Sequence, residues 1–253
     1  MDHPTTYELF EGMTSISALL NTSSDVNDRR ILTVYVDQTK QKSKARELSF
    51  LRVKAAEHGF AIEFLLPDEI EQLASGKTHG GILARVTART IPSIKELSLP
   101  EKGFFVYLEG MEDPYNFGYT LRSLYAAGVD GVLLPERNWM SASGIVARAS
   151  AGTSERMPLY TAASEEIAPL FHKHGYRMLC AGIRDSVSIF EEHFAFPLLL
   201  VIGGEKRGIS HALLESADAV VRIDYGRPFM GSLSAASAAS VIAFELFRQN
   251  IKK

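Results

Sequence analysis

Short apolar segments alternate with helical segments along most of the sequence, and this alternation most constrains the fold. After Gly103 the apolar segments carry few charges, as in FFVYLEGM, GVLLP and PLLLVIGGE. Strands of a parallel sheet that is covered on both faces have this character. Further apolar segments are RMPLY, YRMLCAGI and AVVRIDY, and helical segments such as SEEIAPLFHKHG and HALLESA separate them. The pattern predicts an α/β fold with a doubly wound sheet, followed by a last helix in SAASAASVIAFELFRQNIKK.

The first 95 residues have a similar but separate pattern. YELFEGMTSISALL, DEIEQLA and SKARELSFLRVKAAEHG are predicted to be helical, the last of these ending at Gly59. RRILTVYVD, AIEFLLP and GGILARVTA are predicted to be strands. RTIPSIKELSLPEKG contains two prolines and no clear period, which is typical of a linker. We therefore expect a small α/β domain at residues 1–95, a linker at 96–102 and a second domain at 103–253.

The composition is that of an average globular protein, with 46% hydrophobic and 23% charged residues among 253. No apolar run approaches the roughly 20 residues that cross a bilayer, and the first residues lack the features of a secretory signal, so we expect a cytoplasmic protein. The net charge of −3 argues against indiscriminate binding of nucleic acid and requires that any polyanion meet a local basic patch. The single cysteine, Cys180, lies in an apolar run and is expected to be a buried structural thiol.

Three loops follow the carboxyl ends of predicted strands, where α/β proteins place ligands. DPYNFGYTLRSLYAAG opens a helix near Asn116, a potential N-cap, and carries Arg122 on the flank of that helix. Taken alone, Arg122 is expected to be a surface or ion-paired arginine. LLLVIGGEKRGIS runs from a strand into a glycine-rich loop, which also suits a simple tight turn.

The third loop, RIDYGRPFMGSLSAAS, leads into the last helix through Ser232 and Ser234, and either serine could be only a helix cap. No Gly-x-Ser-x-Gly elbow surrounds them, and the seven histidines lack metal-ligand spacing. In a doubly wound sheet the three loops can converge on one edge. A site that holds Asn, Arg, Glu and two Ser, without metal ligands, suits group transfer from a bound cofactor.

Read together, these stretches resemble the SpoU family of RNA ribose 2'-O-methyltransferases, within the SPOUT superfamily. The family's first motif, Asn-x-Gly-x-x-x-Arg, matches residues 116–122, and its second, Gly-x-Glu-x-x-Gly, matches residues 203–208. The third motif, Ile-Pro-Met and then Ser-Leu-Asn, matches residues 223–225 and 232–234. ARASAGTSERMPLY also resembles the family's Ser-x-Gly-Ala segment at residues 150–153. The resemblance covers roughly residues 100 to 250, with the motifs in the family's order.

The third motif departs from the family pattern. Asp224 and Tyr225 replace Pro-Met, Ser234 replaces Asn, and the intervening loop is a residue longer than we expect. A serine offers one hydroxyl on a shorter arm, whereas asparagine offers an amide donor and an acceptor. These changes leave the expected fold intact but bear on cofactor affinity and substrate geometry.

The resemblance implies a fold, a cofactor and residue roles. The fold is a parallel sheet covered by helices whose last helix forms a deep trefoil knot, with a homodimer across that region. The cofactor is S-adenosyl-L-methionine, and no metal or membrane is implied. The implied cofactor-binding residues are Ile202, Gly203, Gly204, Gly208, Ile223, Tyr225, Ser232 and Leu233. The implied catalytic residues are Arg122, Asn116, Glu205 and Ser234.

Arg122 is the residue that the family would assign to the ribose hydroxyl. A guanidinium normally stays protonated, so stabilisation of the developing alkoxide is a simpler physical role for Arg122 than action as a base. Asn116 and Glu205 would then hold Arg122 or the ribose in place, and Ser234 occupies the position of the family's Asn.

The N-terminal domain is similar to the small substrate-binding domain, itself like certain ribosomal proteins, that many family members carry. Between residues 40 and 54 the chain holds six basic residues against one acid. Phosphate contacts need such a cluster, although a solvated helix face has the same composition. The residues expected to contact rRNA or tRNA are Lys40, Lys42, Lys44 and Arg46.

Two alternatives to an RNA 2'-O-methyltransferase stay open at this point. The altered third motif is compatible with a knotted RNA-binding protein whose catalysis is weakened or lost. A SPOUT enzyme that methylates a base nitrogen is disfavoured, because Asn116, Arg122 and Glu205 together look SpoU-like.

Overall fold

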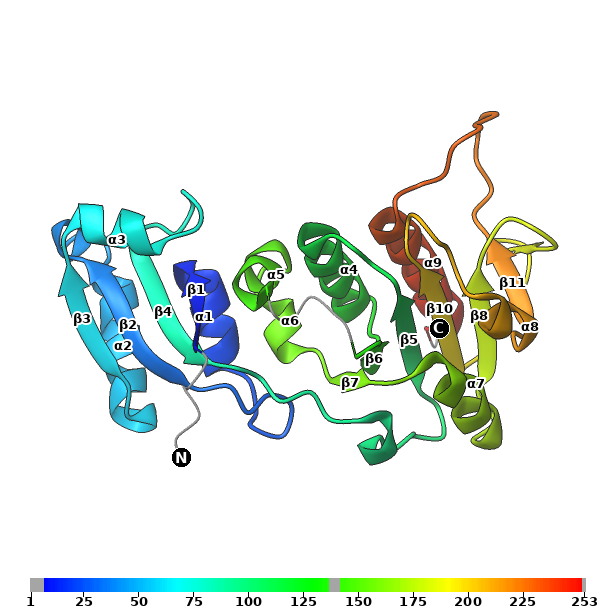
Figure 1. Cartoon of the computed structure of the whole chain (residues 1–253), viewed down its shortest axis with the longest axis horizontal. Coiled ribbons are helices and arrows are strands. Elements are labelled where there is room, and N and C mark those ends of the chain that lie inside the picture. The colour runs from blue at the N-terminus through cyan, green and yellow to red at the C-terminus, as the bar shows by residue number, and fades with distance from the viewer. Residues whose placement is uncertain (1–6, 137–141, 252–253) are drawn as a thin grey trace. The chain divides into compact units, whose positions relative to one another are not determined.

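The computed structural model describes residues 7–136 and 142–251, which divide into two compact units. Unit 1 comprises Met1–Thr90 and Ala142–Arg156, and unit 2 comprises Ile91–Ser141 and Met157–Lys253. The division predicted from the sequence has contiguous domains and places residues 142–156 in the second one. In the structure this segment packs against strand β1 (Tyr7–Glu11) and helix α1 (Gly12–Leu20) of unit 1 (Figure 1).

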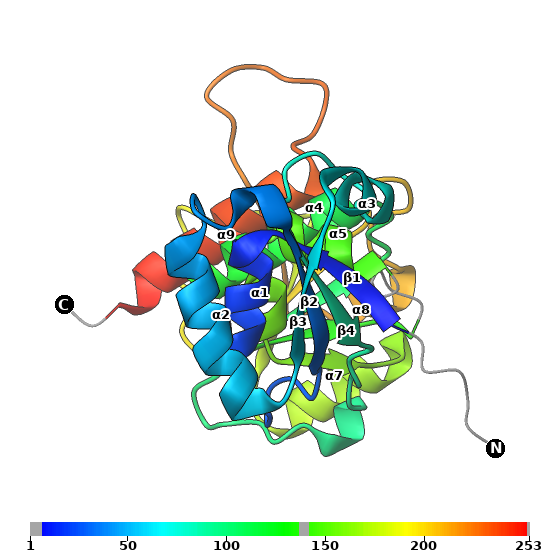
Figure 2. The ribbon, with the colours of Figure 1, turned by 90° about the vertical axis from the view of Figure 1, so that its left-hand side faces the viewer.

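Unit 1 is built on a four-stranded sheet with the order β1-β4-β2-β3. Strands β2 and β3 are parallel, and the other neighbours are antiparallel. Figure 2 shows α2 alongside this sheet. The elements of residues 7–90 are β1 (Tyr7–Glu11), α1 (Gly12–Leu20), β2 (Ile31–Asp37), η1 (Gln38–Lys40), α2 (Ala45–His58), β3 (Ala61–Leu65), α3 (Pro67–Leu73) and β4 (Ile82–Thr87).

The prediction that YELFEGMTSISALL is one helix is wrong for its first five residues. Tyr7–Glu11 forms strand β1, which pairs antiparallel with β4 in the register Tyr7 to Thr87. The strand buries Phe10 in the core, and Gly12, at φ 80°, turns the chain into α1. Pairing with a strand more than 70 residues away decides this segment, and a local periodicity cannot report such a partner.

Helices α5 (Ser143–Ala149) and α6 (Thr153–Arg156) complete unit 1. Ala147 belongs to the same apolar cluster as Phe10 and Val34. Two glycines allow close contact, because a Cβ on Gly144 would lie 2.2 Å from the Leu9 carbonyl oxygen and one on Gly152 would lie 2.4 Å from the Ala18 Cβ. The glycine of the segment at residues 150–153 therefore has a packing role in this chain.

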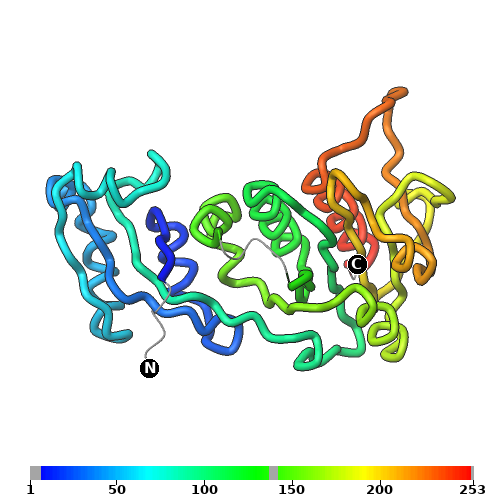
Figure 3. The backbone as a smooth tube through the Cα atoms, in the orientation of Figure 1, coloured from blue at the N-terminus to red at the C-terminus, as the bar shows by residue number. Residues whose placement is uncertain are grey.

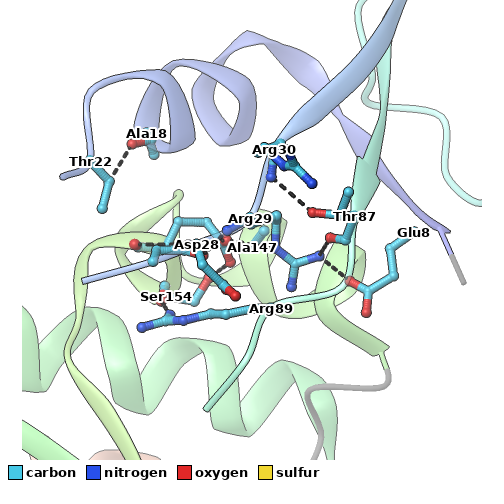
Figure 4. A network of polar contacts seen from close by, with 12 residues as sticks. Glu8, Ala18, Thr22, Asp28, Arg29, Arg30, Thr87, Arg89, Ala147 and Ser154 are labelled. Atoms are coloured by element: carbon cyan, nitrogen blue, oxygen red, sulfur yellow. Dashed lines mark hydrogen bonds and ion pairs between the residues drawn. The ribbon is translucent and has the colours of Figure 1, made fainter. Parts of the chain in front are cut away.

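Buried charges join residues 142–156 to the rest of unit 1, as Figure 4 shows around Arg29. Glu155 is fully buried, and its carboxylate lies 3.1 Å from Nε of Arg29 and accepts a 2.8 Å hydrogen bond from Nδ2 of Asn27. Arg29 also pairs with Glu8, and Nη1 of Arg89 donates to the Ser154 carbonyl at 2.8 Å. A buried ion loses its hydration and needs such partners, so these contacts hold residues 154–155 in one place.

Unit 2 is built on a seven-stranded sheet with the order β7-β6-β5-β10-β8-β11-β9, in which all neighbours are parallel. The strands are β5 (Phe104–Glu109), β6 (Gly131–Leu134), β7 (Leu159–Thr161), β8 (Arg177–Ala181), β9 (Val187–Ser188), β10 (Leu198–Gly203) and β11 (Ala219–Arg222). The helices are η2 (Ile94–Glu96), α4 (Pro114–Ala126), α7 (Ser164–Lys173), α8 (His211–Glu215) and α9 (Ala235–Asn250). The predicted α/β fold with a parallel sheet covered by helices is confirmed.

The strand order places β5 beside β10 at the centre of this sheet. From β5 the chain continues outward through β6 to β7, and β8 and β11 lie on the other side of β10. The two strands are buried along almost their whole length, as their apolar sequences predict. Such a reversal of strand order leaves a crevice beyond the carboxyl ends of the central strands, where open α/β sheets bind ligands.

Candidate active site

A cavity of about 740 Å³ lies at the carboxyl ends of β8, β10 and β11. Three chain segments supply most of its wall: the glycine loop after β10, the end of β11, and the residues that lead into α9. Every position expected to bind a cofactor lines it: Ile202, Gly203, Gly204, Gly208, Ile223, Tyr225, Ser232 and Leu233. The second and third loops therefore meet at one cavity, whose volume suits a ligand of cofactor size.

The glycines of the loop after β10 are needed for close packing of the backbone. A Cβ on Gly204 would lie 1.9 Å from the Gly110 carbonyl oxygen, and one on Gly203 would lie 2.3 Å from the Gly208 carbonyl carbon. Gly208 has φ 65°, in the left-handed region, and pairs with Gly204 in an isolated bridge. Tight chain packing thus explains these glycines, and it leaves backbone rather than bulky side chains at the cavity wall.

The first loop meets the second through Asn116 and Glu205. Nδ2 of Asn116 donates to Oε1 of Glu205 at 3.1 Å, although the two residues are 89 positions apart. Both line a smaller cavity of about 230 Å³ with Asp113 and Lys206. Glu205 also lines the larger cavity, so it adjoins both. The two predicted residues are brought together as expected for one site.

The N-cap of α4 is Asp113, and the expectation that Asn116 caps this helix is wrong. Oδ1 of Asp113 accepts from the Asn116 backbone N–H at 2.7 Å, and Pro114 occupies the first turn. Proline favours that position because its missing N–H would have no partner there. The Asn116 side chain is consequently left to contact Glu205.

Arg122 does not join this cluster. Its side chain is exposed on α4 and lines neither cavity. Tyr115, Tyr119 and Arg122 follow one another at helical spacing, and both tyrosines are exposed. Within residues 7–136 and 142–251, no hydrogen bond or ion pair joins the Arg122 guanidinium to another side chain. In the single chain, Arg122 therefore lies at the surface, as expected for this arginine taken alone.

Ser234 is the N-cap of α9 and also lines the larger cavity. Its Oγ accepts from the Ser237 backbone N–H at 3.2 Å and lies 3.1 Å from the Ser237 hydroxyl. The capping role expected for a serine here is confirmed. The Ser234 hydroxyl, which stands where the family has an asparagine amide, is therefore already used as the helix cap.

Three features of the cavity were missed by the sequence reasoning. Gly182 and Ile183, just after β8, line it, and Phe229 of the loop between β11 and α9 does so as well. The first two carry the signal used elsewhere, a buried strand that ends in glycine. Phe229 carried no such signal, because an aromatic residue in a loop has no distinctive spacing.

The base of the loop between β11 and α9 is held by polar contacts. The Leu233 backbone N–H donates to the Tyr225 hydroxyl at 3.2 Å, and Nε of Arg222 lies 2.8 Å from Oδ1 of Asp224. Hydrogen bonding from Ser188, together with Arg222, holds the pKa of Asp224 below its usual value. Asp224 is therefore ionised, and its charge is already paired at the rim.

The basic segment of unit 1 is partly neutralised by its own neighbours. Lys40 lies 3.7 Å from Asp37, and Lys44 lies 2.8 Å from Glu47. Lys42 and Arg46 are exposed, and neither makes an ion pair with any residue in the described ranges. Of the four residues expected to contact RNA, these two have the charge most available for a phosphate.

No group of three or more His, Cys, Asp or Glu with metal-binding geometry occurs in the described part of the chain. Over the same residues, no helix combines the length and the apolar character needed to span a membrane.

The sequence model of the SpoU rRNA Methylase family matches residues 103–244. The chain belongs to the SpoU rRNA methylase family. Its site motifs, at residues 116–122, 203–208 and 223–234, all lie within the matched region.

Relatives of this SpoU family member extend the likeness to the whole chain. The 23S rRNA (guanosine-2'-O-)-methyltransferase RlmB of Shewanella oneidensis is 27% identical over 251 residues, which cover 96% of this chain and 97% of that protein. RlmB of Haemophilus influenzae is 26% identical and covers 96% and 98% of the two chains. The crystal structure of the AdoMet-bound rRNA methyltransferase from Sinorhizobium meliloti has a TM-score of 0.79, with 20% identity over 97% of this chain and 88% of that one. At this identity, the structural likeness shows a shared fold and nothing further.

Proposed function

We propose that this SpoU family member transfers a methyl group from S-adenosyl-L-methionine to a ribose 2'-hydroxyl of ribosomal or transfer RNA, and that it acts in the cytoplasm. The observation that carries the proposal is the single cavity lined by all eight predicted cofactor positions, which come from two separate motifs. The names of the RlmB relatives, which cover nearly the whole chain, support the same reaction.

The larger cavity fits the proposed cofactor. Its wall at Gly203 and Gly204 is backbone packed without side chains, which leaves room for a ligand to lie against main-chain atoms. Ile202, Ile223 and Leu233 add apolar surface, and Ser232 adds a hydroxyl. When bound there, the cofactor supplies a sulfonium methyl group that is already activated for transfer.

The protein's own part of the reaction is then to position the ribose and to stabilise charge. A ribose hydroxyl becomes a good nucleophile only as negative charge develops on its oxygen, and a guanidinium stabilises such charge without giving up a proton. We assign this role to Arg122, with Asn116 and Glu205 as the hydrogen-bonded pair that orients the ribose. Ser234 fixes the start of α9 at the cavity.

We further propose that the protein is a homodimer across α4 and α9, with the last helix forming the trefoil knot that the family resemblance implies. The two helices pack against each other in unit 2. They expose Tyr115 and Tyr119 on α4, and Phe244 and Phe247 on α9, with 39% to 50% of each residue accessible. Large exposed apolar residues on two helices that pack together are typical of an interface. Arg122 lies on the same side of α4 as the two tyrosines, so dimerisation would change its surroundings.

Calorimetric titration with S-adenosyl-L-methionine under reducing, low-salt conditions tests the cofactor assignment. We expect saturable binding with one site per chain, and weakened binding when Gly203 is replaced by valine, whose side chain would crowd the loop and the cavity wall. The absence of binding by the folded wild-type protein would overturn the enzymatic proposal. It would favour the knotted RNA-binding protein without catalysis, for which the altered third motif is the motivating feature.

A further inference from the structure

The loop between β11 and α9 presents two large apolar side chains to solvent. Figures 1 and 3 show this loop extending beyond the strands of unit 2. Near its tip, Phe229 is 58% exposed and Met230 is fully exposed. Single exposed apolar residues are common on protein surfaces, but this pair adjoins the rim of the larger cavity, which Phe229 itself lines. Its position beside a ligand site indicates a role in binding.

The Phe229 ring is held in place although it is exposed. The ring of Tyr225 lies 5.6 Å from it, centroid to centroid, at an interplanar angle of 63°. A Cβ on Gly231 would lie 2.6 Å from the Phe229 ring, so the ring packs against the Gly231 backbone. The hydrogen bond from Leu233 to Tyr225 closes the loop beneath it. An aromatic ring positioned in this way binds a flat partner with little loss of conformational freedom.

The two loops that form the cavity wall around Phe229 carry exposed arginines. Arg227 lies two residues before Phe229, and Arg207 lies on the glycine loop at the same cavity. Both are exposed, and neither forms an ion pair with another residue in the ranges that the structure describes. The carboxylates near these arginines are engaged by other residues: Asp224 by Arg222, Glu205 by Asn116, and Glu112 by Lys206, although Arg207 also helps to lower the pKa of Glu112. The cavity rim therefore offers a flat apolar surface on a loop that also carries Arg227, and the neighbouring wall segment carries Arg207.

We propose that Phe229 stacks on an unpaired base of the RNA substrate, while Arg207 and Arg227 contact its phosphates. This inference rests on the proposed function, because it names the part of the site that recognises the RNA. Proteins bind single-stranded nucleic acid by this combination of aromatic platforms and cationic side chains. Paired bases are stacked inside a duplex and hide their faces, so the platform selects a nucleotide in a loop, bulge or single strand.

Fluorescence of a single-stranded RNA oligonucleotide that contains 2-aminopurine tests the proposal with the full-length protein. Stacking on a protein ring changes the emission of this base. We expect wild-type protein to change the emission, and Phe229→Leu to abolish that change and to raise the Kd for the oligonucleotide about tenfold, the usual effect of losing one stacked base. Phe229→Trp keeps an aromatic ring and should retain both the emission change and the affinity.

A matched control is Phe190→Leu, because Phe190 is also about half exposed (48%) in unit 2 but does not line the cavity. It should bind the oligonucleotide as the wild type does. A Gly231→Ala variant should behave like Phe229→Leu, since its new methyl group displaces the ring. The wild type and Phe229→Leu should bind fully duplexed RNA of the same sequence with similar Kd values.

Cofactor titration and sedimentation separate the outcomes. If Phe229→Leu binds S-adenosyl-L-methionine normally and retains the emission change and the affinity, the stacking proposal is overturned while the proposed function stands. If the wild-type protein binds no cofactor, the proposed function fails whatever the stacking result. If Phe229→Leu instead shifts the protein to a smaller oligomer without weakening RNA binding, the loop contacts a second copy, and the proposal is likewise overturned.

Discussion

At the scale of single residues, a hydrogen bond between Asn116 and Glu205 connects two loops of the candidate site. It joins the first two family motifs at 3.1 Å and leaves Arg122 apart, exposed further along the same helix, α4. Sequence reasoning could pair the motifs, because both follow central strands of a parallel sheet. It could not place Arg122, because the orientation of a side chain on a helix flank depends on packing that no spacing records.

Arg122→Ala should abolish methyl transfer while leaving the Kd for S-adenosyl-L-methionine within about twofold. The guanidinium is expected to act on charge that develops only during transfer, and losing such a group costs about 100-fold or more in rate. Single-turnover transfer to RNA and cofactor calorimetry measure the two effects. Lys173→Ala, which removes an exposed cation on α7, is the control and should change neither. Unchanged transfer by Arg122→Ala would remove this residue from the mechanism.

Cys180 should be inert towards thiol reagents in the folded protein. Burial, with a smaller effect of Glu109, raises the pKa of this thiol to about 12, and the side chain is fully buried. The thiolate is the reactive form, so at pH 8 the folded protein keeps the thiol protonated, whereas the unfolded chain has a far lower pKa and ionises in part. Colorimetric thiol titration should show slow modification without denaturant and rapid modification in it. Rapid modification of the native protein would contradict the buried structural role.

At the scale of elements, the apolar strands of unit 2 were predictable because burial on both faces leaves a continuous apolar run. The predictions from the sequence fail where the structure of a segment depends on residues that are distant in the chain. Tyr7–Glu11 is a strand because β4 is beside it, and β9 consists of only two residues that extend the sheet beyond β11. Helices α5 and α6 pack in unit 1 although they follow β6 of unit 2 in the chain. No local sequence pattern predicts that the chain returns to unit 1 there.

Gly204→Ala should lower the free energy of unfolding by about 1–3 kcal/mol, the usual cost of overpacking a tightly packed site. Its Cβ would meet the Gly110 carbonyl oxygen at 1.9 Å, so the glycine loop or the loop after β5 must move. Gly226→Ala is the matched control, because nothing lies within 4 Å of its added Cβ. Denaturant unfolding compares the two variants. Equal stability of Gly204→Ala and Gly226→Ala would show that the loop packs differently.

At the scale of the whole molecule, the two units cannot be separated by one cut in the chain. Residues 142–156 belong to unit 1 yet connect β6 to β7 of unit 2. A truncation that removes the N-terminal part of unit 1 would also remove Arg29 and Asn27, the partners of the fully buried Glu155 carboxylate. An uncompensated buried charge is strongly destabilising, so point substitutions are a cleaner test of RNA binding by unit 1 than truncation.

The double variant Lys42→Ala/Arg46→Ala should weaken binding of ribosomal RNA and reduce the slope of log Kd against log salt by about 2, roughly one for each phosphate that the protein no longer neutralises. The comparison is Lys54→Ala, whose ammonium group is already paired with Glu57 at 2.7 Å. Filter binding over a range of salt concentrations gives both slopes. An unchanged slope in the double variant would show that this helix face is only solvated.

The central claim is ribose methylation, and the product of the reaction tests it most directly. Ribosomal and transfer RNA are incubated with the protein and S-adenosyl-L-methionine carrying a labelled methyl group, and the RNA is then digested in alkali and to nucleosides. We expect label in 2'-O-methylated nucleosides and in an alkali-stable dinucleotide, because cleavage in alkali needs a free 2'-hydroxyl. Label in a methylated base with an unmodified ribose, or no label with either RNA, would contradict the claim.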